Sequence, residues 1–246
     1  LSTSYLRDRG SDTPRLDADL LLGHVLELDR VQLYTRTDQQ VPDEARQAFR
    51  QLVKRRAAGE PVAYLIGRRE FWQMELKCDR RALVPRPDTE VLVEVALEKL
   101  PEQTSLRVVD VGTGTGAVAL AIAGERPEAS LAATDISSEA LDLAGENARR
   151  VGVAERVAFF QGDLLEAVPG DWRPVDAVVS NPPYVADDDA ELAADVRAYE
   201  PDEALLAGAD GLAVIRRLVS QAREAIRPGG WLIFEIGHRQ GEAVRE

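Results

Sequence analysis

The sequence predicts an α/β protein whose main part is a doubly wound parallel sheet, preceded by a small α-helical domain and a β-hairpin linker. From residue 85 onward, short apolar strand segments alternate with helical segments, a pattern typical of parallel sheets that carry helices on both faces. A glycine-rich turn follows the first of these strands, as expected where such a sheet meets a ligand. We therefore expect a helical bundle at 1–60, a hairpin linker at 61–84 and the sheet domain at 85–246.

The N-terminal segment shows helical periodicity alone. Apolar residues recur at three- and four-residue steps between Leu16 and Leu28, which predicts one helix with a single apolar stripe. Pro42 at a first-turn position predicts the start of a second helix, which we expect to end at Gly59. The proline, glycine and aromatic residues at 61–72 then predict extended strands or a hairpin.

The sheet domain contains apolar segments of strand length separated by segments with helical periodicity. The expected strands lie at 107–111, 130–135, 156–161, 175–180 and 231–236. The expected helices lie at 88–99, 116–124, 138–150 and 211–226.

The composition indicates a folded protein. The 246 residues are 45% hydrophobic, which is enough apolar material for a buried core. Cys78 is the single cysteine, so no internal disulfide can form and a reducing compartment is expected. No apolar run approaches the ~20 residues that span a bilayer, and residues 1–10 lack the apolar segment of a signal peptide. Two scattered histidines and one cysteine do not form a metal site. We therefore expect a cytoplasmic protein without membrane or metal binding.

The net charge of −13 is unevenly distributed along the chain. Residues 1–84 hold 15 Lys and Arg against 13 Asp and Glu, a net +2, whereas residues 85–246 hold 15 against 30, a net −15. Proteins that bind duplex nucleic acid usually need a strongly basic surface, because neutralisation of phosphates by Lys and Arg supplies much of the affinity. The acidic sheet domain therefore favours a small molecule or a protein as partner, or an acidic surface that is solvated and has none.

A candidate ligand site follows the strand at 107–111, which runs into Gly112-Thr113-Gly114-Thr115-Gly116 and then a helix. Glycines allow a tight turn and close approach of a ligand, and the helix N-terminus presents unpaired N–H groups. Asp135, at the end of the next strand, can accept hydrogen bonds from both hydroxyls of a ribose. These features predict a nucleoside-binding site, and the loop also satisfies a looser dinucleotide fingerprint that leaves NAD open. Asp163, after the third strand, fits either an acceptor for an adenine amino group or a surface carboxylate.

The fourth strand is followed by Asn181-Pro182-Pro183-Tyr184. Two prolines fix φ, remove two N–H donors and favour extended neighbours, so the amide oxygen of Asn181 and the carbonyl of Pro182 can point at one spot. Such a rigid pair of acceptors suits a planar –NH2 group, which Tyr184 can cover with its ring. Hydrogen bonds from both N–H groups would aim the nitrogen lone pair at an electrophile, so positioning and electrostatics would supply most of the catalysis. A proline-rich turn with a buried tyrosine is the alternative interpretation.

Together these residues resemble those of S-adenosylmethionine-dependent methyltransferases with an amino-nitrogen acceptor and a Rossmann-like sheet. The chain more closely resembles the HemK/PrmC family, the release factor glutamine methyltransferases. The resemblance covers nearly the whole chain, and Asn-Pro-Pro-Tyr alone is shared with DNA adenine-N6 methyltransferases, whereas the block at 85–90 is not. The blocks that carry the resemblance are Gly59-Glu60-Pro61, Arg69-Glu70-Phe71-Trp72, Pro85-Arg86-Pro87-Asp88-Thr89-Glu90, 108–123, 178–185, Val196-Arg197, Glu200-Pro201 and Gly229-Gly230.

The resemblance implies S-adenosylmethionine as cofactor and S-adenosylhomocysteine as product. It implies that Asp135 binds the ribose, that Asp163 and Leu164 lie near the adenine, and that Asn181 also adjoins the cofactor. The residues implied to hold the methionine part are Gly112, Thr113, Gly114, Thr115 and Gly116.

The implied substrate is the glutamine of the Gly-Gly-Gln motif in a peptide chain release factor, methylated at N5 by a monomeric enzyme that the N-terminal bundle helps to dock. Asn181, Pro182 and Tyr184 are the implied catalytic residues: the first two hold the glutamine amide and the tyrosine packs on the substrate. Pro183 is implied to shape the loop.

Three residues of the block at 85–90, Arg86, Thr89 and Glu90, are implied to line the crevice without individual roles. A helix start after Pro87 with ordinary first-turn acids explains them equally well.

The sequence departs from the family at its ends. Family members usually continue with a helix and a final antiparallel strand pair, whereas this chain stops at Glu246. Either the terminal segment is disordered or absent from this sequence, or the sheet has an exposed edge strand. The chain also starts at Leu1 rather than at a methionine, as a trimmed sequence would.

Two other functions remain open at this point. A nucleic-acid amino methyltransferase of the adenine-N6 type shares the tetrapeptide but is disfavoured by the acidic sheet domain. A methyltransferase fold kept as a non-catalytic scaffold is disfavoured by the presence of both Asp135 and Asn181.

Overall fold

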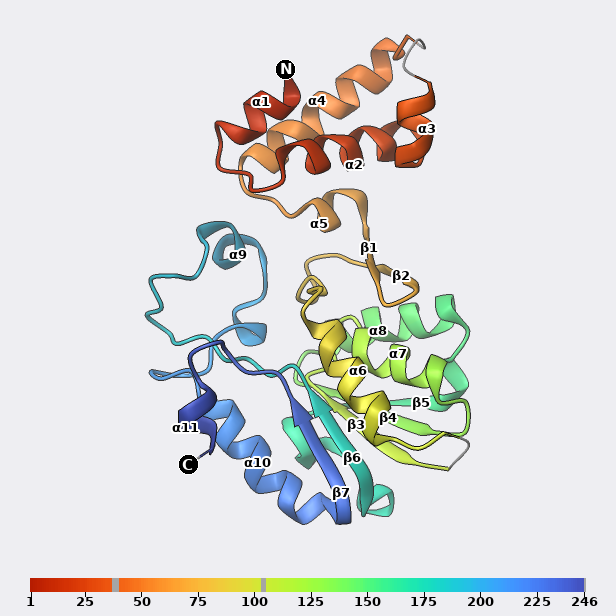
Figure 1. Cartoon of the computed structure of the whole chain (residues 1–246), viewed down its shortest axis with the longest axis vertical. Coiled ribbons are helices and arrows are strands. Elements are labelled where there is room, and N and C mark those ends of the chain that lie inside the picture. Colours follow the sequence, from red (N-terminus) through yellow and green to blue (C-terminus); the bar gives the residue numbers. More distant parts are fainter. Residues whose placement is uncertain (37–39, 103–104, 246) are drawn as a thin grey trace. The chain divides into compact units, whose positions relative to one another are not determined.

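The computed structural model describes residues 1–36, 40–102 and 105–245, and the chain divides into two compact units (Figure 1). The first unit comprises Leu1–Arg68 and Ala193–Tyr199, and the second comprises Arg69–Leu192 and Glu200–Glu246. None of the helices in the three described ranges has both the length and the hydropathy that a membrane crossing requires.

The first unit is built of helices, as the sequence predicts for residues 1–60, but a further helix at Val62–Ile66 lies in the segment that was predicted to be extended. Its helices are α1 (Ser2–Arg7), α2 (Pro14–Leu26), α3 (Arg30–Thr35), α4 (Asp43–Ala57), α5 (Val62–Ile66) and α9 (Ala194–Tyr199). Its buried core consists of Leu6, Ala18, Leu21, Val53 and Leu65. The two expected helices are α2, which starts with Pro14 at its first turn, and α4, which carries Asp43 and Glu44 in its first turn. Gly59 follows α4 with a φ of 101°, a left-handed conformation that favours glycine.

The hairpin of the linker consists of β1 (Arg68–Phe71) and β2 (Met74–Lys77), which form a two-stranded sheet. Its turn is held by Trp72, whose backbone N–H donates to Glu90 Oε1 at 2.8 Å and whose indole N–H donates to Glu125 Oε1 at 2.9 Å. The aromatic pair that predicted extended structure therefore lies at the end of β1 and in the turn.

The second unit is built on a five-stranded sheet in which every described pairing is parallel. Its strands are β3 (Arg107–Val111), β4 (Ser130–Asp135), β5 (Val157–Gln161), β6 (Val175–Ser180) and β7 (Ile226–Phe234). The strand order is β5-β4-β3-β6-β7, so the chain moves outward from β3 in one direction and then returns to the other side of β3. The point where the order reverses lies between β3 and β6, and ligands of such sheets bind there, beyond the carboxyl ends of the strands.

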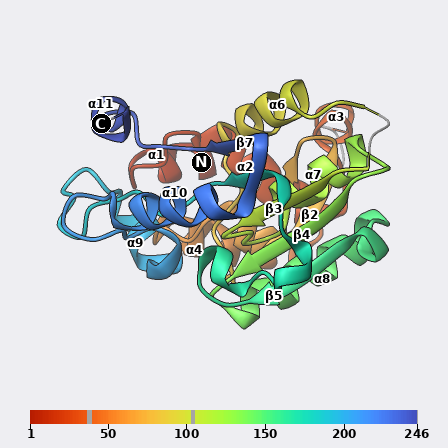
Figure 2. The same ribbon diagram turned by 90° about the horizontal axis from the view of Figure 1, so that it is seen from below.

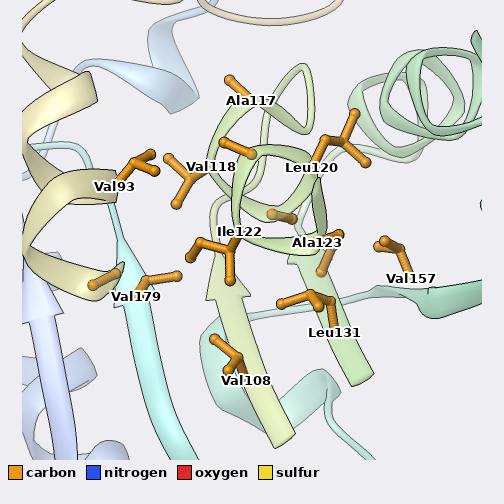
Figure 3. Close-up of a cluster of buried hydrophobic side chains, with 14 of the residues drawn as sticks. Val93, Val108, Ala117, Val118, Leu120, Ile122, Ala123, Leu131, Val157 and Val179 are labelled. Carbon is orange, nitrogen blue, oxygen red and sulfur yellow. The ribbon is translucent and has the colours of Figure 1, made fainter. Parts of the chain in front are cut away.

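Helices cover both faces of this sheet, as its alternating side chains require (Figures 1 and 2). Val108 faces one core with α6 (Thr89–Lys99), α7 (Ala117–Glu125) and α8 (Ser138–Val151), and Figure 3 shows part of this cluster. The next residue, Val109, faces a second core with α10 (Ala213–Ala225). The remaining elements are short 3-10 helices at Ala154–Arg156, Leu164–Ala167, Gly170–Trp172 and Asp202–Ala204, and α11 (Gly241–Arg245).

The strand β7 differs most from the sequence prediction, since it begins at Ile226 rather than at residue 231. Its pairing with β6 shifts register between Val175 and Ala177, which places the residues Arg227–Gly230 in a bulge. Pro-Gly-Gly in this segment is typical of a turn, so it concealed the early start of the strand. A Cβ on Gly230 would lie 2.6 Å from the backbone oxygen of Asp176, so only glycine fits this close approach. In the described residues β7 is one edge of the sheet.

Candidate active site

The candidate site lies at the carboxyl ends of β3, β4 and β6, where the strand order reverses. Val111 and Ser180 are paired at the ends of β3 and β6, and the Ser180 hydroxyl donates to the Val111 carbonyl at 2.8 Å. This bond brings the two following loops together: a Cβ on Gly112 would lie 4.0 Å from the backbone oxygen of Asn181. The glycine-rich loop and the tetrapeptide predicted from sequence are therefore neighbours.

The glycine-rich loop has a conformation that requires glycine. Gly112, Gly114 and Gly116 have φ values of 71°, 56° and 85°. The N–H groups of Gly112 and Thr113 both donate to the carbonyl of Thr134 at 2.9 Å, which holds the loop against the end of β4. These hydrogen bonds fix the loop in place before a ligand binds. A Cβ on Gly112 or Gly114 would meet nothing closer than 3.8 Å, so the backbone is uncovered there, whereas a Cβ on Gly116 would lie 3.1 Å from the Leu120 side chain.

Asp110 in β3, a residue that the sequence analysis did not single out, is hydrogen-bonded to this loop and to the helix that follows it. Its side chain is buried, and Oδ2 accepts hydrogen bonds from the Thr113 hydroxyl at 2.7 Å and from the Ala119 N–H at 3.1 Å. Burial raises the pKa of this carboxyl to about 6, and the two hydrogen bonds oppose that rise. Its only signal in the sequence is an acid inside an apolar strand just before the glycine turn.

Asp135 connects the loop to the end of β4. Its Oδ2 accepts from the Gly114 N–H at 2.9 Å and its Oδ1 from the Ser137 N–H at 3.0 Å. Burial raises the pKa of Asp135, while these N–H groups stabilise the ionised form. Since each carboxylate oxygen can accept about two hydrogen bonds, both keep acceptor capacity for the hydroxyls of a ligand.

Thr115 in the same loop is buried, and its carbonyl accepts from Asn147 Nδ2 at 2.9 Å. The same Asn147 side chain accepts from the Lys77 N–H at 2.7 Å and donates to the Lys77 carbonyl at 3.1 Å. Asn147 therefore joins the glycine-rich loop to β2 of the hairpin, a role that its position within α8 did not indicate.

The segment after β5 also reaches the site. The Gly162 N–H donates to the Asp135 carbonyl at 2.9 Å, which places Asp163 and Leu164 beside the end of β4. Asp163 is partly exposed, and its Oδ2 pairs with Arg217. Leu164 has a left-handed φ of 50°. Asp163 is thus partly exposed with one oxygen engaged, and it lies close to the predicted nucleoside site.

The side chains of the tetrapeptide are held by residues from two other elements. Asn181 Nδ2 donates to Thr89 Oγ1 at 3.0 Å, and the Thr89 hydroxyl donates to Glu235 Oε2 at 2.8 Å. The Tyr184 hydroxyl donates to the other oxygen of the same carboxylate, Glu235 Oε1, at 3.1 Å. Burial and the neighbouring carboxylate raise the pKa of Tyr184 to about 12, so it stays protonated at neutral pH.

The backbone after the tetrapeptide is held from the C-terminal side. The Tyr184 carbonyl accepts from Gln240 Nε2 at 3.0 Å, and Gln240 Oε1 accepts from the Gly237 N–H at 2.8 Å. Gly211 packs directly against this carbonyl, since a Cβ there would lie 2.4 Å from it. Neither Gln240 nor Gly211 was predicted to belong to the site.

The three residues without assigned roles are placed differently. Thr89 contacts Asn181, as described above. Glu90 holds the hairpin turn through Trp72, and Arg86 pairs with the buried Glu200 at 2.6 Å. Of the three, Thr89 is the residue with a hydrogen bond to the tetrapeptide, and Arg86 lies close enough to Tyr184 to act on its pKa. Among the residues the structure describes, no cluster of His, Cys, Asp or Glu could hold a metal ion.

Comparisons with known proteins identify the family to which the chain is similar. Residues 2–67 match a family model described as the PrmC N-terminal domain, and residues 89–201 match the methyltransferase small domain. A Xylella fastidiosa protein named release factor glutamine methyltransferase is 47% identical over 231 residues, covering 94% of this chain and 83% of its own. A Vibrio cholerae protein of the same name is 44% identical over 245 residues, covering 99% of this chain and 84% of its own.

One solved structure adds evidence on the fold alone. The hMettl16 catalytic domain is 15% identical, has a TM-score of 0.54, and the match covers 68% of this chain and 63% of that domain.

Proposed function

The chain belongs to the release factor glutamine methyltransferase family, and from that premise we propose which of its residues carry out the reaction. The reaction is methylation of a glutamine in a release factor, with S-adenosylmethionine as the methyl donor of this class of enzyme. The relatives decide between the two acceptors that the tetrapeptide leaves open, a protein amide and a nucleic-acid amino group. The observation that carries the assignment is the direct proximity of the glycine-rich loop and the tetrapeptide at the reversal point of the sheet.

The cofactor site is proposed to be the glycine-rich loop and Asp135. Gly112 and Gly114 leave the backbone open to close approach, and Asp135 keeps acceptor capacity for ribose hydroxyls. Asp163 and Leu164 are proposed to lie beside the adenine, because the Gly162–Asp135 hydrogen bond holds their segment next to the ribose acceptor. Bound S-adenosylmethionine supplies a methyl group on a positively charged sulfur. Thr113 and Thr115 act here through the fixed backbone of the loop, since both side chains are buried.

The substrate site is proposed to be Asn181, Pro182, Pro183 and Tyr184, with the glutamine of a Gly-Gly-Gln motif as ligand. The Asn181 Oδ1 atom and the Pro182 carbonyl accept the two N–H groups of the glutamine amide, which orients its nitrogen lone pair. Tyr184 covers the amide with its ring and stays protonated, so it does not act as the base. No strong base is needed, because the surplus proton can leave for water after the methyl group has been transferred.

Mass spectrometry of a purified release factor tests this proposal. The factor is incubated with the protein and S-adenosylmethionine, digested, and the peptide with the Gly-Gly-Gln motif is sequenced. We expect one additional methyl group on that glutamine and none when the glutamine is replaced by alanine. Methylation of another residue with the motif intact would contradict the assignment of the substrate.

A further inference from the structure

We propose that Thr89 and Glu235 are positioning residues that fix which end of the Asn181 amide faces the substrate. The inference rests on the proposed role of Asn181 in holding the glutamine amide. It concerns two residues that lie 92 positions before Asn181 and 54 positions after it in the sequence.

The physical problem is the near-symmetry of an asparagine side chain. Its oxygen and its NH2 group are similar in size, so packing alone distinguishes the two orientations poorly. Only the orientation with Oδ1 toward the substrate can accept a hydrogen bond from a glutamine N–H. The flipped orientation would place one NH2 group against another and repel the substrate amide.

The hydrogen bonds running from Glu235 through Thr89 to Asn181 remove this ambiguity. A carboxylate offers acceptors but no donor, so the single hydroxyl proton of Thr89 is directed to Glu235 Oε2, at 2.8 Å. The Thr89 oxygen is then left as an acceptor, and it accepts from Asn181 Nδ2 at 3.0 Å. With Nδ2 turned to Thr89, Oδ1 is the atom on the other branch of the amide, free to face the substrate.

The surroundings make these bonds rigid. Thr89 is only 5% exposed and is the first residue of α6, while the Glu235 N–H donates to the Ser180 carbonyl at 3.0 Å just beyond the end of β7. The second oxygen of Glu235 accepts from the Tyr184 hydroxyl at 3.1 Å. One carboxylate therefore orients both polar side chains of the tetrapeptide, one directly and one through Thr89.

The first test compares Thr89→Val with Thr89→Ser. Valine keeps the shape but removes the hydroxyl that holds Nδ2, so Asn181 loses both its fixed orientation and its fixed position. We expect kcat for release factor methylation to fall roughly 10- to 100-fold: free choice between the two orientations accounts for about twofold, and misplacement of Oδ1 for the rest. The Kd for S-adenosylmethionine should stay within about twofold, because the glycine-rich loop and Asp135 are unchanged, and the loss should appear in kcat and in kcat/KM for the release factor. Serine restores the hydroxyl and should recover most of the parental kcat.

The second test is a double-variant comparison with Glu235→Ala. If the carboxylate acts on Asn181 through Thr89, combining Glu235→Ala with Thr89→Val should lower kcat no further than Glu235→Ala alone. Independent roles would instead multiply the two losses, and that result would overturn the proposal.

A matched control separates positioning from stability. Asp176, near the other end of β6, also accepts two hydrogen bonds, from the Arg107 N–H at 2.8 Å and from Arg227 Nε at 2.6 Å. Asp176→Ala should lower the melting temperature and leave kcat per folded molecule unchanged. A lower melting temperature with parental kcat for Thr89→Val as well would show a structural role only and overturn the positioning role.

Asn181→Ala distinguishes failure of this inference from failure of the proposed function. If Asn181→Ala is inactive while Thr89→Val keeps the parental kcat, the positioning inference is wrong and the role of the tetrapeptide stands. If Asn181→Ala turns over normally, the proposed role of the tetrapeptide is itself wrong, and the inference is overturned with it.

Discussion

Oδ2 of Asp135 accepts a hydrogen bond from the backbone N–H of Gly114 at 2.9 Å. This bond joins the acid at the end of β4 to the middle of the glycine-rich loop that follows β3. Two parts of the proposed cofactor site, one for a ribose and one for the methionine part, therefore hold each other in place. Part of the ordering that binding requires is already present, which favours tight binding because less conformational entropy remains to be lost.

Replacement of Asp135 by alanine should weaken cofactor binding without unfolding the sheet. The change removes the ribose acceptor and leaves the N–H groups of Gly114 and Ser137 without their carboxylate. We expect the Kd for S-adenosylmethionine, measured by isothermal titration calorimetry, to rise roughly 5- to 150-fold, or about 1–3 kcal/mol. The exposed Asp142 on α8 provides the control, since Asp142→Ala should leave this Kd unchanged. Equal affinities for parent and Asp135→Ala would show that the ribose lies elsewhere.

Replacement of Asn181 by alanine should separate chemistry from cofactor binding. The variant loses an acceptor for the glutamine amide, so methyl transfer followed by mass spectrometry should become undetectable. The Kd for S-adenosylmethionine should stay within about tenfold of the parental value, or about 1.4 kcal/mol, because the glycine-rich loop and Asp135 are intact. Joint loss of turnover and cofactor binding would mean that Asn181 acts mainly on the cofactor.

The sequence predicted those parts of the fold and site that depend on local pattern. Strands β3, β4 and β6 lie where the apolar segments predicted them, and the loops that follow β3 and β6 are the glycine-rich loop and the tetrapeptide. A local pattern cannot predict partners that meet only after the strands are ordered. Thr89 and Glu235 are 146 positions apart and meet because β7 pairs with β6, so neither could be assigned a role beforehand.

The early start of β7 was missed for a different reason. Pro-Gly-Gly is typical of a turn. A strand can contain it here because the pairing of β7 with β6 shifts register between Val175 and Ala177. Asp110 was missed because an acid in a strand becomes informative only once its burial is known. Both cases depend on neighbours across the sheet rather than on neighbours along the chain.

Replacement of Gly211 by alanine should disturb the tetrapeptide from outside the site. The new Cβ would lie 2.4 Å from the Tyr184 carbonyl and 2.9 Å from Gln240 Nε2, at a φ of 70° that alanine avoids. We expect the free energy of unfolding in urea to fall by more than about 1 kcal/mol and kcat to fall with it, because the Tyr184 carbonyl must move. Gly124 in α7 is the control, since a Cβ there meets nothing within 4 Å and Gly124→Ala should raise stability by roughly 0.5–1 kcal/mol. A Gly211→Ala protein as stable and active as the parent would contradict the close contact.

Replacement of Asp110 by asparagine should change how stability depends on pH. Burial raises the pKa of Asp110 in the folded protein from the ordinary 3.8 to about 6, so the folded state holds this proton more tightly than the unfolded state. The resulting stabilisation is present in full below about pH 4 and is lost as the pH rises through 6. One pKa unit corresponds to about 1.36 kcal/mol, so Asp110 alone should lower the free energy of unfolding by about 2–3 kcal/mol between pH 4 and pH 8.

Asparagine isolates this contribution because both hydrogen bonds of Asp110 end on Oδ2, which an amide oxygen can replace. Urea unfolding of parent and Asp110→Asn across this pH range gives a difference curve in which all other titrating groups cancel. The free energy of unfolding of the variant should rise relative to that of the parent as the pH rises. Most of this rise should fall between pH 4 and pH 6, because in that range the Asp110 carboxyl of the parent is protonated mainly in the folded state. A flat difference curve would show that the Asp110 carboxyl has the same pKa in the folded and unfolded states, and that its burial does not raise this pKa.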